Sequence, residues 1–187
     1  FDVDRDGRQE FLIGYSLWGA DGKRRWSHDA ALKDHADALS LGNFTGRQSA
    51  GVRAYIDGSD EGFLVIAADG TIVKHLRLGH AQTQSIGKYR PDLPGLQILI
   101  ATFWRNPGIV TLLDADANGL AQEEMIPGSS HLEPVNWRGD GQEFALLSGN
   151  VREGGMIDGQ LRRVVMFPDD GHPDLAITGD FKTRQLF

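Results

Sequence analysis

The sequence predicts an all-β fold, a β-propeller built from four-stranded antiparallel blades. Histidines recur at His35, His80, His131 and His172, at spacings of 45, 51 and 41 residues, which is the length of one blade. Three of them are followed by a glycine seven residues on and an aromatic residue nine residues on. Glycine is frequent, with 24 residues, and no segment has a long 3.6-residue period, so turns are favoured over helices.

Each repeat contains segments that suit the successive strands of a blade. The segment after the histidine alternates apolar and polar residues, as a half-buried first strand does. Apolar runs predicted as second strands lie at 10–14, 97–102 and 143–148, and those predicted as third strands lie at 62–67 and 108–113. Turns such as Asp21-Gly22 and Asp69-Gly70 then lead into a fourth strand.

The repeats also predict the limits of the blades. They indicate a part blade at 1–34, blades at 35–79, 80–130 and 131–171, and a part blade at 172–187. Propellers close with roughly four to eight blades. We therefore expect a fragment of a seven- or eight-bladed propeller, and the alternative is a small four-bladed ring closed by its two part blades.

Composition restricts the partners and the location. The net charge of -7 argues against nucleic acid as a partner, because nucleic-acid-binding proteins usually carry a basic face. No stretch approaches the roughly 20 apolar residues of a membrane helix, so no membrane is expected as a partner either. The chain has no cysteine, which is compatible with a secreted protein that needs no disulfides. We expect a secreted or periplasmic location, with any signal peptide outside this chain.

The opening residues read D-V-D-R-D-G-R-Q-E from position 2 and suggest a calcium loop. The carboxylates of Asp2, Asp4 and Asp6 alternate, the backbone carbonyl of Arg8 is available, and Glu10 follows. Calcium takes about six to eight oxygen ligands, which such a loop can supply. An EF-hand is excluded because a strand rather than a helix follows. The alternative is a solvated Asp-Gly turn that holds no ion.

One face of the predicted blades gathers the residues suited to chemistry. Strands alternate in direction, so the loop before the first strand and the loop between the second and third strands lie on the same face. The repeated histidines therefore meet there, near the central channel. The second set of loops adds Tyr15 with Trp18, Tyr55 with Asp57, Trp104 with Arg105, and Asn150 with Arg152.

This composition suits an acidic carbohydrate. Aromatic rings stack on sugar faces, arginine pairs with a carboxylate through two parallel hydrogen bonds, and histidine can move a proton near neutral pH. The alternative for each histidine is a structural hydrogen bond that links neighbouring blades.

Several segments resemble the propellers of polysaccharide lyases. HAQTQSIGKYRPDLPGLQI at 80–98, followed by FWRNPGIVTLLDADANG at 103–119, is similar to ulvan lyases and rhamnosyl-glucuronate lyases, and more distantly to rhamnogalacturonan lyases. IGYSLWGADGKRRW at 13–26 and HADALSLG at 35–42 are similar to the preceding blade. The aspartate-rich opening loop resembles the calcium loop of FG-GAP-type blades.

The resemblance implies β-elimination at a uronic acid. His35 and His80 match family histidines at blade starts, and Arg105 is implied to neutralise the substrate carboxylate. Tyr15 stands where these lyases often carry a second catalytic histidine, so it is implied as base or acid. The residues expected to bind substrate are Trp104, Asn106, Tyr55, His131 and Arg152.

The sequence therefore predicts a polysaccharide lyase that acts on an acidic, uronate-containing and rhamnose-rich glycan, with structural Ca²⁺. One alternative is a non-catalytic, calcium-stabilised propeller that binds glycan or protein. Another is a structural propeller domain of a larger enzyme whose active site lies elsewhere.

Overall fold

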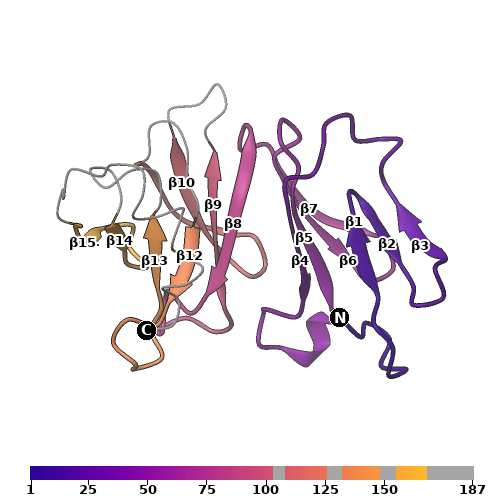
Figure 1. Ribbon diagram of the computed structural model, residues 1–187, viewed down its shortest axis with the longest axis horizontal. Coiled ribbons are helices and arrows are strands. Elements are labelled where there is room, and N and C mark those ends of the chain that lie inside the picture. Colours follow the sequence, from indigo (N-terminus) through magenta and orange to yellow (C-terminus); the bar gives the residue numbers. More distant parts are fainter. Residues whose placement is uncertain (103–107, 126–131, 148–154, 168–187) are drawn as a thin grey trace.

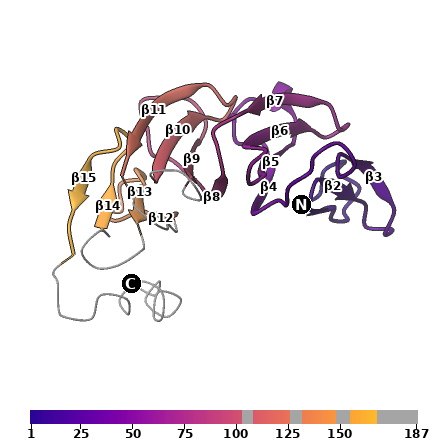
Figure 2. The same ribbon diagram turned by 90° about the horizontal axis from the view of Figure 1, so that it is seen from above.

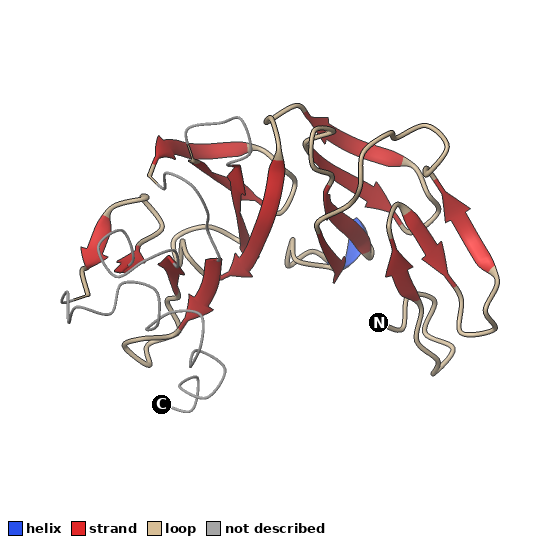
Figure 3. Ribbon diagram, turned by 45° about the horizontal axis from the view of Figure 1, so that its top comes forward, coloured by secondary structure: helices blue, strands red, loops and turns tan. Residues whose placement is uncertain are grey.

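The computed structural model describes residues 1–102, 108–125, 132–147 and 155–167, which form four antiparallel sheets (Figures 1 and 3). Among these residues the only helical element is one 3-10 turn, η1 (Gln48–Ala50). The predicted all-β class is confirmed. Within the same residues, no helix has the length and apolar character needed to span a membrane.

The sheets follow one another along the chain, and each strand pairs with the next. The first two sheets consist of β1 (Phe11–Ile13), β2 (Ser16–Trp18) and β3 (Arg24–Ser27), then β4 (Ala38–Gly42), β5 (Arg53–Asp57), β6 (Phe63–Ala67) and β7 (Ile72–Leu76). The last two consist of β8 (Ala81–Gly87), β9 (Gln97–Thr102), β10 (Ile109–Asp114) and β11 (Gly119–Glu124), then β12 (Leu132–Val135), β13 (Phe144–Leu147), β14 (Gly155–Ile157) and β15 (Arg163–Val165). The first sheet has three strands, and the other three are four-stranded meanders, which are the building unit of a propeller.

The described sheets stand side by side in an arc (Figure 2). The first strands β4, β8 and β12 lie on the inner side of the arc, and the last strands β7, β11 and β15 lie on the outer side. Neighbouring inner strands contact one another, β4 with β8 and β8 with β12. The sheets are thus blade-like, while the total of seven or eight blades stays a prediction.

The hydrophobic core lies in the seams between sheets. In β6, Phe63 and Val65 pack toward the β8–β11 sheet, whereas Leu64 and Ile66 pack toward the β1–β3 sheet. All four side chains are fully buried. Because side chains alternate across a strand, one continuous apolar run fills two cores.

The repeated glycine and aromatic residue have a packing explanation. A Cβ built on Gly42 would lie 2.9 Å from the ring of Phe44, and one on Gly87 would lie 3.1 Å from the ring of Tyr89. Each aromatic ring packs into the seam core with the following sheet. The glycine therefore leaves room for the ring that its own repeat supplies.

The structure differs from the sequence prediction around Tyr15 and Trp18. We predicted both for a loop between the second and third strands. A tight turn at Gly14 and Tyr15 instead joins β1 to β2, and Trp18 lies within β2, opposite Phe11. The strand predicted as the third of this part blade is β2, and it begins immediately after the turn. The expected loop is therefore only two residues long.

Candidate active site

Two of the repeated histidines come together at the seam between the second and third sheets. His35 precedes β4 and His80 precedes β8, and their ring centroids are 6.1 Å apart. The backbones of Ser59, in the β5–β6 loop, and Ala81 exchange hydrogen bonds of 3.1 and 3.0 Å across the seam. This pairing fixes the start of β8 against the neighbouring sheet and so positions His80.

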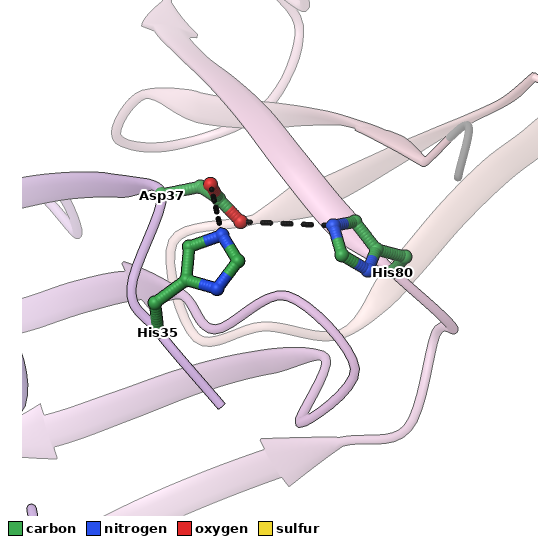
Figure 4. A group of neighbouring side chains, drawn as sticks. All are labelled: His35, Asp37 and His80. Atoms are coloured by element: carbon green, nitrogen blue, oxygen red, sulfur yellow. Dashed lines mark ion pairs between the residues drawn. The ribbon is translucent and has the colours of Figure 1, made fainter. Parts of the chain in front are cut away.

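Asp37 lies between the two imidazole rings (Figure 4). Its Oδ1 is 3.0 Å from His35 Nε2, and its Oδ2 is 3.9 Å from His80 Nε2. We call His35, Asp37 and His80 the seam cluster. The side chain of His35 is 65% exposed, whereas those of His80 and Asp37 are 12% and 9% exposed, so solvent reaches the cluster at His35.

Two further carboxylates orient the rings from their other side. Asp34 Oδ1 is 2.8 Å from His35 Nδ1, and Asp60 Oδ1 is 2.7 Å from His80 Nδ1. Asp34 also accepts hydrogen bonds from the backbone amides of His35 and Asp60. Both rings therefore carry a carboxylate at Nδ1 and direct Nε2 toward Asp37.

Hydrogen bonds hold Asp37 in place. The hydroxyl of Ser59 donates to Asp37 Oδ2, and the side-chain amide of Gln82 donates to Oδ1 at 3.0 Å. Gln82 Oε1 is also 3.2 Å from His80 Nε2. Asp37 is therefore fixed by residues of both sheets, which makes the spacing of the two histidines a property of the seam.

A fourth carboxylate, Asp57, lies buried beside the cluster. Its backbone carbonyl accepts from the Asp37 amide at 2.8 Å, but neither of its side-chain oxygens has a hydrogen-bond partner in the described structure. Burial, and secondarily the charge of Asp37, raise the pKa of Asp57 well above its usual value.

The charges also affect His35 and Asp34. The hydrogen bond from Asp34 raises the pKa of His35, and this outweighs the opposite effect of burial. The pKa of Asp34 is lowered, first by the backbone amide of His35 and then by that of Asp60. His35 is thus held toward its protonated form and Asp34 toward its ionised form.

Tyr15 lies close to the cluster but faces away from solvent. Its side chain is buried, its hydroxyl donates to the His35 carbonyl at 3.1 Å, and burial raises its pKa above the usual tyrosine value. It shares a position near the two histidines, as expected, but its phenol is engaged with the backbone.

Tyr55 was predicted to bind substrate, and the structure places it differently. It lies within β5, is fully buried in the seam core, and donates its hydroxyl to the Ala115 carbonyl at 3.0 Å. A buried, satisfied phenol packs rather than binds, so we do not carry Tyr55 into the site.

The other predicted site residues lie outside the described residues. They are Trp104, Arg105, Asn106, His131 and Arg152. The segment that contains Arg105 begins directly after Thr102, the last residue of β9, which pairs with Ala81 beside His80. Its attachment point is therefore at the same end of the β8–β11 sheet as the seam cluster.

The predicted calcium loop brings its three aspartates together. Ligand atoms of Asp2, Asp4 and Asp6 lie within 4.8 Å of one another. Asp2 accepts from the amides of Asp6 at 3.1 Å and of the following glycine at 3.0 Å, which folds the loop around its carboxylates. The loop lies at the lower end of the first sheet in Figure 1, opposite the β7–β8 link.

Glu10 adds a buried carboxylate next to this loop. It is 3% exposed, and its Oε2 accepts from the Val3 amide at 2.8 Å. Its Oε1 has no hydrogen-bond partner among the described residues, and Arg25 Nη2 lies 3.9 Å away. The amide of Arg8 donates to Asp6 at 2.8 Å. This all-oxygen donor set fits a calcium ion.

Sequence reasoning missed Asp34, Asp37 and Asp60. A signal for Asp37 was present, because the residue two positions after each of the four repeated histidines is polar: Asp37, Gln82, Glu133 and Asp174. Asp60 had no such signal, because its contact with His80 depends on how neighbouring sheets pack.

The chain was compared with known proteins. The crystal structure of the rhamnogalacturonan lyase YesW matches with a TM-score of 0.55 and 20% sequence identity, over 87% of this chain and 29% of that chain. No protein-family model and no curated protein matches the sequence. This chain therefore spans less than a third of the length of that lyase, and it shares a polysaccharide lyase-like fold with that part.

Proposed function

We propose that this chain belongs to a polysaccharide lyase that cleaves a uronic-acid-containing, rhamnose-rich glycan by β-elimination. The observation that carries the proposal is the meeting of His35 and His80 in one cluster that solvent reaches. The fold shared with part of a rhamnogalacturonan lyase adds support. The partner is an acidic polysaccharide, which suits a secreted or periplasmic location.

In this reaction a base removes the proton on C5 of the uronate, the C4–O4 bond breaks, a C4–C5 double bond forms, and an acid protonates O4. We assign the proton transfers to His35 and His80, because an imidazole changes charge near neutral pH. Tyr15 does not suit the role of base, because its phenol is buried and its pKa is raised.

The charge of the site sets a further requirement. Asp34, Asp37 and Asp60 repel a uronate carboxylate, and within the described residues no lysine or arginine forms an ion pair with them. A cation must therefore neutralise the substrate and acidify its C5 proton. We assign this role to Arg105, whose planar fork matches a carboxylate.

Calcium is the structural cofactor in this proposal. Asp2, Asp4, Asp6, the carbonyl of Arg8 and Glu10 would hold the ion. The support is the three clustered aspartates and buried Glu10, whose Oε1 accepts no hydrogen bond from the described residues. A bound Ca²⁺ would supply positive charge that holds the loop against the first sheet. It takes no part in the elimination.

A non-catalytic, calcium-stabilised propeller that binds glycan or protein is the second candidate. The specific observation in its favour is the acidity of the described site, which disfavours an anionic polymer. A binding module needs no paired acid and base around one arginine, so activity separates the two functions.

The test follows the ultraviolet absorbance of the unsaturated uronate product during incubation with ulvan, rhamnogalacturonan and gum-arabic-type glycans. Absorbance should rise with one of them. The His80→Ala variant should lose about 10²- to 10⁴-fold in rate, the contribution typical of a positioned acid or base. Arg105→Lys should also lose most activity, because a point charge replaces the planar fork.

The matched control is His75→Ala, since His75 lies on β7, outside the seam cluster, and its ring Nε2 is 2.8 Å from the Glu61 carbonyl. This variant should keep full activity. A folded His80→Ala protein with full activity would remove the catalytic assignment. Saturable glycan binding without any absorbance rise would favour the binding module.

A further inference from the structure

We propose that His35, Asp37 and His80 form a binding site for a first-row divalent transition-metal ion such as Zn²⁺. The ligands are Nε2 of each histidine and the carboxylate of Asp37, so the site spans two neighbouring sheets (Figure 4). Imidazole nitrogens suit zinc and its neighbours, whereas calcium and magnesium prefer all-oxygen sites. The inference goes beyond the lyase reaction and does not rest on it.

The spacing of the three ligand atoms suits such an ion. All lie within 4.8 Å of one another, with His35 Nε2 at 3.0 Å from Asp37 Oδ1 and His80 Nε2 at 3.9 Å from Asp37 Oδ2. Ligands about 2.1 Å from a tetrahedral zinc ion stand about 3.4 Å apart. Shifts of less than about 1 Å would close the site, and a water molecule could take the fourth position, since the His35 side chain is exposed.

The surroundings of both rings match those of metal-bound histidines. Such a histidine usually directs its other ring nitrogen to a carboxylate or carbonyl, which fixes the tautomer. Here Asp34 lies at 2.8 Å from His35 Nδ1 and Asp60 at 2.7 Å from His80 Nδ1. With the N–H on Nδ1, the Nε2 lone pair of each ring is directed toward Asp37 and is available to a cation that displaces the contact between His80 Nε2 and Gln82 Oε1 at 3.2 Å.

The neighbourhood also has a deficit of positive charge. Buried Asp57, linked through its carbonyl to the Asp37 amide, has two side-chain oxygens without partners in the described structure. No described ion pair joins a lysine or arginine to Asp34, Asp37, Asp57 or Asp60. Burial holds Asp57 toward its neutral form, so the carboxylates that favour a cation there are Asp34, Asp37 and Asp60 around the two rings.

Metal binding and proton transfer use the same nitrogen atoms. A histidine whose Nε2 is bound to an ion cannot accept a proton there, so the lyase reaction proposed above uses the metal-free cluster.

The test is calorimetric titration of tag-free protein with Zn²⁺ in saturating Ca²⁺, which occupies the aspartate loop. Wild-type protein should bind one equivalent, and Co²⁺ should give a visible spectrum with histidine ligands. His35→Gln, at an exposed ring, and Asp37→Asn should both lose this equivalent. Asp60→Asn should weaken binding about 10- to 100-fold, as loss of an orienting carboxylate does.

His75→Gln is the control and should bind zinc as the wild type does, since His75 belongs to none of the described groups of metal-ligating side chains. Circular dichroism would establish that each variant is folded. The inference is overturned if wild-type protein binds no stoichiometric zinc, or if folded His35→Gln and Asp37→Asn proteins both bind it with unchanged affinity.

Discussion

At the scale of single residues, Asp116 shows how one side chain ties two sheets together. It lies in the β10–β11 turn and accepts hydrogen bonds of 2.8 and 2.7 Å from Arg47, in the β4–β5 connection, and of 2.9 Å from Arg53, at the start of β5. Burial acts to raise the pKa of Asp116, but the bonds from Arg47 and Arg53 outweigh it and leave the pKa below its usual value.

Asp116→Asn should lower the free energy of unfolding by about 1–2 kcal/mol at neutral pH, because Arg53, 12% exposed, loses its counter-charge. The folded-state pKa of Asp116 is the lower one. The contribution of Asp116 to the free energy of unfolding is therefore complete above its pKa in the unfolded state, about 3.9. It is lost as the pH falls through its pKa in the folded state.

Urea denaturation of wild type and variant at neutral pH and at about pH 3 measures this difference. The gap between the two proteins should narrow in acid. A gap independent of pH would show that the ion pair across this seam does not stabilise the fold.

The burial of Tyr55 could not be predicted from the sequence. Tyr55 was predicted for a loop, but it lies in β5, whose burial on both faces removes the alternation that would mark a strand in the sequence. The structure places it with Phe44, ring centroids 5.1 Å apart, in a seam core. Its neighbours come from a different sheet, so no local pattern identifies them.

At the scale of elements, the turn before β6 depends on a glycine. Gly62 has φ of +83°, and a Cβ built there would lie 2.2 Å from the backbone carbonyl oxygen of Leu76 in β7. The β6–β7 pairing thus needs both the left-handed conformation and the missing side chain.

Gly62→Ala should destabilise the protein by about 1–3 kcal/mol for backbone strain alone, with the clash adding to it. Gly22→Ala is the matched control, because Gly22 has φ of +74° but nothing within 4 Å of a built Cβ. It should cost only about 1–2 kcal/mol. Thermal denaturation compares the two, and equal losses would show that the contact with Leu76 relaxes at no cost.

The elements also show which strands a sequence can reveal. The alternating segments after His35 and His80 correspond to β4 and β8. These strands have five and seven residues, which is long enough for the alternation to be recognised in the sequence. The strand β2 has only three residues, which is too short for an alternation to be recognised, and it follows a two-residue turn. For this reason Trp18 was predicted for a loop.

At the scale of the whole molecule, the histidine repeat predicted the succession of antiparallel sheets and the meeting of His35 with His80. The carboxylates around them were not predicted, because Asp60 reaches His80 only after one sheet packs on the next. The repeat predicts the strands within each blade, whereas the site lies at the contact between two neighbouring sheets.

Calcium removal should lower the stability of the whole protein. An ion bound only by the folded state stabilises it by about 2.7 kcal/mol when its free concentration is 100 times Kd. The thermal midpoint of wild type should therefore rise with Ca²⁺ and fall with a chelator, and Asp4→Asn should reduce this response. The control is Asp69→Asn, whose aspartate caps an ordinary turn by accepting from the Thr71 amide at 2.9 Å. Thermal midpoints that do not change with the calcium concentration would favour the alternative, a solvated Asp-Gly turn that holds no ion.

Strands of the middle sheets contribute side chains to two seam cores, and this affects which parts of the protein unfold locally. Two middle sheets, β4–β7 and β8–β11, are covered on both faces, whereas in β1 Phe11 and Ile13 are 44% and 59% exposed. When each unit gains stability only from its neighbours, protection spreads along the row as in a one-dimensional array. Amide hydrogens of β5 and β9, in the two sheets that are covered on both faces, should exchange slowly, so the histidines sit at a junction that rarely separates.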